Sequence, residues 1–398
     1  MLLRLLSLAG ADSVRGFQIG MVVVAILTCL AAYLLGRALA GPVAGLTASA
    51  LLTVAPPFPL FAHRVLADLP PLGLALVSFW LAVLARQRRS AALAAGGGGA
   101  LALAATVKPN ALLALPPFLL LLLWERFGRL RYLAAATAGA ALVGAAFAVA
   151  YRDVLGELWE SVVVYHRDAR DTPDVIDKTH ELVTFLNWRT PFAWLVVAGL
   201  GATVLLLRRR GEEDLWSLWS WAAISVAFLV YHHPLHYNHL LVLPVVLALP
   251  AAIALAAVVT RTARRNVAIG ALALALVAAY VQQQRRIVLD QVSEEADLVR
   301  AAEIVRRETE PDDLVVSDHS IVPFIADRRV AGPLVDTAAL RFETGSLSDA
   351  EVLQVLEQKA VTAVVVGRAF ASRRSLVRDL DRRFPQRFDA GSVTVYVR

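Results

Sequence analysis

The sequence contains a single cysteine, Cys29, among its 398 residues, and that cysteine lies within an apolar run. An internal disulfide framework and a cysteine-based zinc site are therefore excluded. Charge is also scarce, because Asp, Glu, Lys and Arg make up only 18% of the residues, against roughly 25% in soluble domains. Hydrophobic residues account for 58% of the chain, and its mean hydropathy is +0.60. This composition predicts a polytopic α-helical membrane protein.

The net charge of +6 does not indicate a nucleic-acid-binding protein. Most of the excess is carried by short arginine clusters that stand between apolar runs, and this distribution is typical of loops that face the cytoplasm and anionic lipids. Membrane lipids are therefore expected partners, and nucleic acid is not.

Ten apolar runs are long enough, or nearly long enough, to cross about 30 Å of hydrocarbon. They are residues 17–36, 42–58, 69–85, 91–106, 109–124, 132–150, 191–207, 215–231, 238–259 and 266–283. The run 91–106 is short and contains four consecutive glycines, which favours close helix packing. Beyond Gln284 charged residues become frequent and apolar segments shorten to strand length. We therefore predict a multi-span domain over residues 1–283 and a second domain over residues 292–398.

Arginine clusters predict the orientation of the spans. Four clusters follow alternate spans, at residues 86–89, 126–131, 208–210 and 261–265, and the positive-inside rule places all four in the cytoplasm. The loops expected outside are then 59–68, the turn at Lys108, 151–190 and 232–238, together with the second domain. The N-terminus would also lie outside although it has no signal-peptide pattern, so we expect an upstream span to be missing.

The loop 151–190 is long for a simple connector. Its first part places Leu155, Trp159 and Val163 at helical spacing, which predicts an amphipathic helix on the outer leaflet. The charged residues that follow fit either a polar cavity or a solvated linker.

Helical and strand patterns alternate in the second domain. Helices are expected over residues 294–309, 349–359 and 372–384, and strands over 312–318, 361–367 and 389–398. This order predicts a mostly parallel sheet with helices on its faces. Asp318, His319 and Asp336 follow strands or lie in loops, where ligands commonly bind in such sheets. Because no glycine-rich phosphate loop accompanies them, acceptor recognition or folding is a better interpretation than catalysis.

The stretch "PLFAHRVLADLPPLG" brings His63, Arg64 and Asp68 between two apolar runs. Arg64 and Asp68 are four residues apart, so a helical turn would place them on one side as an interfacial ion pair at a wet surface. The alternative interpretation is a polar site that faces a lipid-linked substrate.

Four histidines open the ninth apolar run, in "YHHPLHYNHL". His232, His236 and His239 have the spacing of a helical metal face, but the sequence offers no obvious further ligand. Histidine and tyrosine are also common interfacial anchors. Contact of His236 and Tyr237 with a donor or acceptor is a third interpretation.

Three stretches together carry a resemblance to a known family. They are "FQIGMVVVAILTCLAAYLLGRALAGPVAGLTASALLTVAPPFPLFAHRVLADLPPLGLALVSFWLAVLAR", "GALALAATVKPNALLALPPFLLLLL" and "HYNHLLVLPVVLALPAAIAL". Over roughly residues 1–283 the chain resembles the GT-C membrane glycosyltransferases of the protein O-mannosyltransferase and aminoarabinose-transferase type, glycosyltransferase family 39. The family marks are a Gly-Arg turn, an outward Arg and Asp like Arg64 and Asp68, and a Thr-Lys mark like Thr106 and Lys108.

The resemblance implies transfer of a sugar from a polyprenyl-phosphate donor to a lipid, glycan or protein acceptor on the outer face of the membrane. Such transfer needs a carboxylate to take the acceptor's proton, and positive charge or a divalent metal ion to stabilise the departing phosphate. The sequence does not decide whether a metal is used. Lys108 and Arg64 are the expected phosphate ligands, and Lys108 is expected to begin a helix whose dipole attracts phosphate. The candidate donor- or acceptor-binding residues are His63, Arg64, Asp68, Lys108, His236 and Tyr237.

One feature departs from the family pattern. Members carry the catalytic aspartate in a first outward loop after a first helix, and nothing in this sequence matches that segment. Asp12 lies in a connection to a later family helix, so the role is not transferred to it and the catalytic residue stays unassigned. A start codon placed too late, or an inactive relative, are the two explanations that we consider. Two other classes stay open: a lipid or solute transporter, and a non-catalytic membrane scaffold or sensor.

Overall fold

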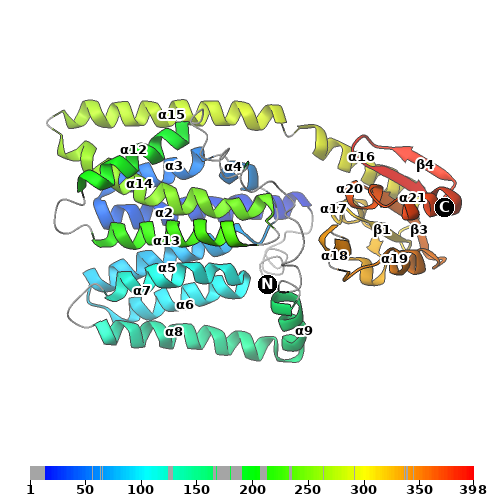
Figure 1. The fold of residues 1–398 in the computed structure, drawn as a ribbon, viewed down its shortest axis with the longest axis horizontal. Coiled ribbons are helices and arrows are strands. Elements are labelled where there is room, and N and C mark those ends of the chain that lie inside the picture. The colour runs from blue at the N-terminus through cyan, green and yellow to red at the C-terminus, as the bar shows by residue number, and fades with distance from the viewer. Residues whose placement is uncertain are drawn as a thin grey trace. The chain divides into compact units, whose positions relative to one another are not determined.

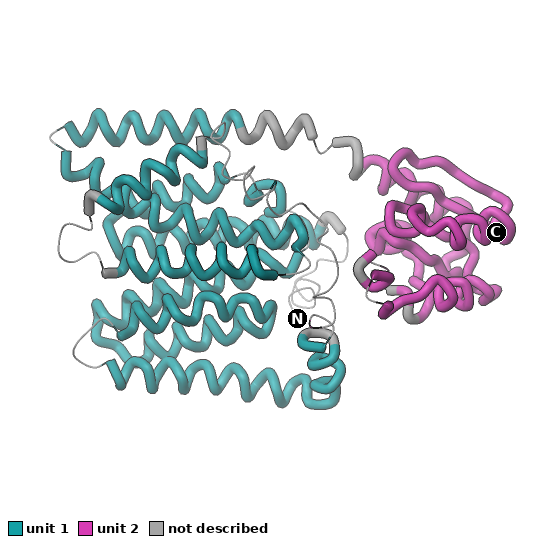
Figure 2. Tube along the Cα trace, viewed as in Figure 1, with its two compact units in different colours: residues 1–164, 173–285 teal, residues 165–172, 286–398 magenta. Residues whose placement is uncertain are grey.

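The structure, a computed structural model, describes most of the 398 residues. The described residues are 14–55, 57–62, 64, 66–123, 129–164, 167, 180, 191–206, 213–232, 235–262, 264–290, 292–335, 337, 339–343 and 345–398. The chain divides into two compact units (Figure 2): residues 1–164 with 173–285, and residues 286–398 with 165–172.

All ten predicted apolar runs contain helices in unit 1 (Figure 1). The helices are α2 (Val14–Ala40), α3 (Pro42–Val54), α5 (Leu69–Gln87), α6 (Ala91–Val107), η1 (Pro109–Ala114) leading into α7 (Leu115–Leu123), α8 (Arg129–Ala150), α12 (Pro191–Leu206), α13 (Glu213–Tyr231), η5 (Tyr237–Leu241) leading into α14 (Val242–Arg261), and α15 (Arg265–Asp290). The short helix α4 (Pro57–Phe61) lies between α3 and α5. Six of these segments are long and apolar enough to cross a membrane, and the others are shorter apolar helices. The chain is therefore a multi-pass membrane protein.

Glycines bring α6 and α8 into close contact. A Cβ added to Gly98 would lie 2.0 Å from the carbonyl oxygen of Ala136, and one added to Gly139 would lie 2.0 Å from the carbonyl oxygen of Ala95. Only a residue without a side chain fits at these distances, so the two backbones touch directly. This confirms the expectation that the glycine run in 91–106 serves helix packing.

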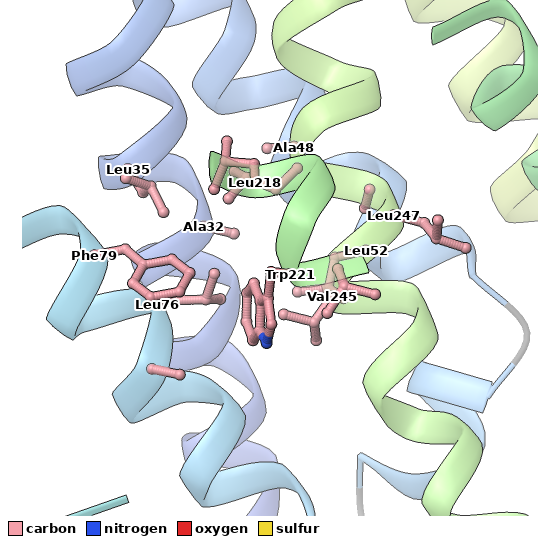
Figure 3. Close-up of a cluster of buried hydrophobic side chains, with 14 of the residues drawn as sticks. Ala32, Leu35, Ala48, Leu52, Leu76, Phe79, Leu218, Trp221, Val245 and Leu247 are labelled. Carbon is pink, nitrogen blue, oxygen red and sulfur yellow. The ribbon is translucent and has the colours of Figure 1, made fainter. Parts of the chain in front are cut away.

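The interior of unit 1 is built from aliphatic and aromatic side chains of α2, α3, α5, α13 and α14 (Figure 3). Phe79 of α5 and Trp221 of α13 meet edge to face, with ring centroids 4.9 Å apart. Helices α8 and α15 differ from the rest, because only 6% of the apolar window of each is buried inside the protein. Their apolar side chains are suited to contact with lipid.

Three short helical segments follow α8: η2 (Arg152–Val154), α9 (Leu155–Trp159) and η3 (Glu160–Val164). Leu155, Trp159 and Val163 are exposed apolar residues here. Their arrangement agrees with the predicted amphipathic segment, although the helix is shorter than expected and ends in a π-helical turn.

Unit 2 is an α/β domain. Its elements are α16 (Val292–Glu308), β1 (Leu314–Ser317), α17 (Ile321–Ala326), β2 (Arg329–Val330), η6 (Gly332–Val335), α18 (Ala339–Glu343), α19 (Asp349–Leu356), β3 (Val361–Val366), α20 (Arg368–Ala371), α21 (Arg374–Arg383), β4 (Gln386–Asp389) and β5 (Thr394–Val397). The strand order is β2-β1-β3-β5-β4. One core lies under α19 and α21, and a second under α16 and α17, so helices cover both faces as predicted.

The expectation of a mostly parallel sheet is wrong. Strand β1 pairs in parallel with β2 and β3, but β5 pairs antiparallel with both β3 and β4. The short connection between β4 and β5, which turns at Gly391 with φ +91°, is the physical reason for the antiparallel β4–β5 pair. A tight hairpin can join only antiparallel strands.

Candidate functional site

Asp68 stands at the N-terminus of α5, and its side chain is buried although the sequence suggested a wet surface. The residue is only 7% exposed. It takes the N-cap position before Leu69 and the Pro70–Pro71 pair, but its side chain makes no capping hydrogen bond. Prolines fit this first turn because its N–H groups have no helical partner. The carboxylate is therefore available for partners from other elements.

Lys108 provides the first of these partners. Its ammonium donates to Asp68 Oδ1 in an ion pair. Lys108 is held in extended backbone between the end of α6 and the start of η1, where Pro109 takes the first helical position. An ammonium has three N–H donors, so donation to one carboxylate oxygen leaves capacity to bind a second anion.

Asn238 provides the second partner. Its side-chain amide donates from Nδ2 to Asp68 Oδ2 at 2.8 Å. Both carboxylate oxygens are thus engaged, by residues 40 and 170 positions away in the sequence. A carboxylate with both oxygens engaged is suited to positioning Lys108.

A pocket opens beside this cluster. Asp68, Asn110 and His239 supply its polar lining. The rest is apolar and comes from the start of α5, from η1, from α13 and from the start of α14: Pro71, Leu72, Ala75, Ala111, Leu113, Trp221, Phe228 and Val242. A mostly apolar hollow with a few convergent polar groups is the usual form of a small-ligand site.

Three histidines of the ninth run, His232, His236 and His239, form a packed cluster next to the pocket, and His233 lies outside the described residues. His239 lies edge to face against His232 and His236, with centroid distances of 4.9 and 5.5 Å. The backbone N–H of His236 donates to His239 Nδ1 at 3.3 Å. A neutral His239 then carries its proton on Nε2. His236 itself caps η5 by accepting from the backbone N–H of His239.

Arg64 and Tyr237 both lie close to Phe61. The guanidinium of Arg64 is 5.4 Å from the Phe61 ring centroid, and the Tyr237 ring is 5.6 Å from it. The expected Arg64–Asp68 ion pair is wrong. The chain at Arg64 bends instead of continuing a helix, and Lys108 takes the place of the arginine beside Asp68.

Some predicted residues do not enter this site. His63 lies outside the described residues, as does Asp336. In unit 2 the carboxylate of Asp318 accepts from the backbone N–H groups of Gly367 and Phe370, at 2.6 and 2.9 Å. Asp318 therefore acts as a structural cap for α20. Within the described part of the chain, no group of three or more His, Cys, Asp or Glu residues could hold a metal ion.

Sequence reasoning missed Asn238, Asn110 and the two pocket aromatics, Trp221 and Phe228. Asn238 carried a weak signal, because an amide at the entry to an apolar run has a high desolvation cost unless it finds a partner. Trp221 and Phe228 carried none, since aromatic residues within spans are ordinary core residues.

Comparison with known proteins identifies the fold. No protein-family model matches the sequence, and no curated protein matches it. Solved structures do match. ArnT from Cupriavidus metallidurans bound to undecaprenyl phosphate has a TM-score of 0.68 at 13% identity, over 96% of this chain and 83% of ArnT. The apo state of the same protein gives 0.69 at 14% identity, over 95% and 83%.

A second solved protein shares the arrangement at lower similarity. The Archaeoglobus fulgidus oligosaccharyltransferase AglB, in complex with an inhibitory peptide and a dolichol-phosphate, has a TM-score of 0.51 at 15% identity. The match covers 88% of this chain and 58% of AglB. The shared arrangement confirms the predicted architecture: this chain has the GT-C glycosyltransferase fold, with a small α/β domain at its C-terminal end.

Proposed function

We propose that this protein transfers a sugar from a polyprenyl-phosphate donor to an acceptor on the extracytoplasmic face of the membrane. The observation that carries the proposal is the cluster of Lys108, Asp68 and Asn238 at the edge of the pocket. Two neighbours of the same fold are named in complex with undecaprenyl phosphate and a dolichol-phosphate. These carriers share a phosphate on a polyprenyl chain, which is the group that a lysine at the end of a membrane helix is suited to bind.

The reaction assigns a role to each member of the cluster. A nucleophilic oxygen or nitrogen of the acceptor forms a bond to the anomeric carbon of the sugar, while the bond from that carbon to the phosphate oxygen breaks. The electron pair of the broken bond leaves with the polyprenyl phosphate, and Lys108 stabilises its growing negative charge. Asp68 and Asn238 hold the ammonium in place. The acceptor's proton goes to a base that this proposal does not assign to any residue.

Sugar transfer by the full chain in proteoliposomes tests the proposal. Radiolabelled undecaprenyl-phosphate sugars would be supplied with lipid, glycan and protein fractions of a bacterial envelope as acceptors. We expect label to move into one fraction, and Lys108→Ala to lower the rate about 100-fold or more, the scale found when a preorganised charge-stabilising group is removed. Lys359→Ala, at an exposed site in unit 2, is the matched control and should leave the rate unchanged. A chain that neither binds nor uses any carrier would support the scaffold interpretation instead.

The proposed orientation needs a separate experiment. In a Cys29→Ala background, single cysteines would be introduced at Ala350, Lys178 and Arg209 and labelled in intact cells with a membrane-impermeant maleimide. The arginine distribution predicts labelling at Ala350 and Lys178 and protection at Arg209. Labelling at Arg209 with protection at Ala350 would place the site on the cytoplasmic face.

A further inference from the structure

The pocket beside Asp68 contains a polar side chain that the protein itself does not satisfy. Asn110 lies in the first turn of η1, two residues after Lys108, and is half-buried in the pocket wall. Its amide makes no hydrogen bond within the described residues. The other two polar lining residues differ, because Asp68 has both oxygens engaged and His239 accepts at Nδ1.

An amide has both an acceptor oxygen and an NH₂ donor. A sugar hydroxyl donates and accepts, so it matches both groups, whereas an ionised phosphate only accepts. The hydrogen-bonding capacity of Asn110 is therefore better matched to a hydroxylated ring than to the phosphate that Lys108 is placed to bind.

The polyprenyl chain of the donor would gain little free energy by entering this pocket. A polyprenyl chain is already surrounded by hydrocarbon in the bilayer, and lipid tails are as apolar as leucine side chains. Burying it against Leu72 and Val242 would gain little, and it would leave the Asn110 amide without a partner. A sugar, by contrast, cannot be solvated by lipid tails and needs a lined site.

The lining also favours one class of sugar. Asp68 is the single charged residue in the pocket wall as described, and Lys108 already neutralises it. Because this pair leaves the described wall without an unpaired charge, neither a cationic amino sugar nor an anionic sugar would find a counter-charge in it. Trp221 and Phe228 are seven residues apart on α13, so these two aromatic lining residues lie about 10 Å apart along the helix.

We propose that this pocket holds the sugar of the donor, that the sugar is a neutral hexose or pentose, and that Asn110 recognises one of its ring hydroxyls. The proposal rests on the proposed function, because it places the phosphate of the same donor at Lys108. It deepens that function by naming the substrate class and a residue that determines specificity.

The experiment measures carrier affinity for the full chain in lipid nanodiscs. The probes are undecaprenyl phosphate alone and the same carrier bearing glucose, mannose, galactose, arabinose or 4-amino-4-deoxyarabinose. In the wild type we expect at least one neutral-sugar carrier to bind about tenfold more tightly than both the bare and the aminoarabinose carriers. Asn110→Ala and Asn110→Leu should cut this advantage about five- to tenfold, the worth of one hydrogen bond, with less than a twofold change for the bare carrier. Leu112→Ala is the control, because Leu112 lies on the same turn but is 51% exposed.

The outcomes separate the two proposals. Failure of the wild type to bind bare carrier, or binding that Lys108→Ala leaves unchanged, would overturn the proposed function and this inference with it. Binding that depends on Lys108 but shows no preference for a neutral sugar would overturn the inference alone. So would a preference that survives in both Asn110 variants, or an equal loss for bare and sugar-loaded carriers, which would place Asn110 at the phosphate.

Discussion

Helix α5 carries an ion pair near each end, and the two pairs differ in what surrounds them. Beyond its N-terminus, Asp68 pairs with Lys108 and also accepts from Asn238, next to a pocket. Near its C-terminus, Arg86 donates from Nη2 to Asp214 Oδ2 at 2.7 Å. There the Arg86 Nε is buried with no hydrogen-bond partner in the described part of the chain.

In our proposal, the difference separates a phosphate-binding arrangement from a structural one. Arg86 joins the end of α5 to the start of α13, where no residue lines the pocket. The Lys108 pair joins three elements and keeps donor capacity beside a hollow that a ligand can enter. A charged pair near a membrane boundary is thus not by itself a functional site. The adjacent pocket and the remaining N–H donors of Lys108 distinguish the Lys108–Asp68 pair from the Arg86–Asp214 pair.

The largest expected effect comes from breaking each pair in turn and measuring sugar transfer. Asp68→Asn removes the charge that holds Lys108, so we expect transfer to fall about 10- to 100-fold. Arg86→Ala removes the other pair and should change transfer less than about threefold in the protein that inserts. Equal losses in the two variants would show that both pairs act through folding alone.

A second test disturbs the helix bundle without touching either pair. Gly98→Ala forces a methyl group into the Ala136 backbone, and we expect a loss of about 1–3 kcal/mol in stability from overpacking. Gly144→Ala is the matched control, because nothing lies within 4 Å of its Cβ position. Melting temperatures in detergent would compare the two, and an equal shift would refute direct contact between α6 and α8.

A third test asks whether Asn238 contributes to the arrangement of Asp68 and Lys108. Asn238→Ala leaves Asp68 Oδ2 without its amide donor while keeping Lys108 in place. We expect affinity for undecaprenyl phosphate to fall about five- to tenfold, less than the full worth of a hydrogen bond to a charged group, because Asn238 acts on Lys108 only through Asp68. Ser220→Ala, at a half-buried hydroxyl that bonds only to its own helix, is the control. Unchanged affinity in Asn238→Ala would remove Asn238 from the positioning cluster.

The smallest expected effect concerns Glu351, a carboxylate in unit 2 that lies outside the candidate site. The Ser348 hydroxyl and backbone N–H donate to Glu351 and lower the pKa of that carboxyl. A folded-state pKa below the unfolded value of about 4.3 means that the stabilisation is present above that pH and is lost as pH falls through the folded pKa. The protection factors of α19 amides, that is, their exchange rates relative to the intrinsic rates at the same pH, should fall in that acid range. Glu351→Gln should show little of this pH dependence, and an identical dependence in both proteins would contradict a role for the Ser348–Glu351 hydrogen bonds.

The sequence predicted the membrane helices well, for a physical reason. An apolar run long enough to span a bilayer is a local property, so the runs at 69–85 and 132–150 became α5 and α8. The edge strands of unit 2 were harder to predict. Strand β2 has two residues, and β4 is four residues long with three of them exposed, so neither carries an apolar alternation that could be recognised.

The sequence indicated some residues of the candidate site, but it did not indicate which side chains contact one another. Asp68 and Lys108 were recognisable because charge is costly between apolar runs. The i, i+4 spacing then suggested Arg64 as the partner of Asp68, which assumed a helix that the chain does not form. The contact with Asn238 spans 170 residues, so only the folded chain, which brings Asn238 of η5 to the N-cap of α5, reveals it.

The most direct test of the central claim, that Lys108 binds the phosphate of the carrier, is the ratio of affinities for undecaprenyl phosphate and undecaprenol. Both lipids have the same chain, so the ratio isolates the phosphate. We expect the wild type and Arg86→Ala to prefer the phosphate about 100-fold or more, and Lys108→Ala to lose most of that preference. A preference that is intact in Lys108→Ala would contradict the account and place the phosphate elsewhere in the protein.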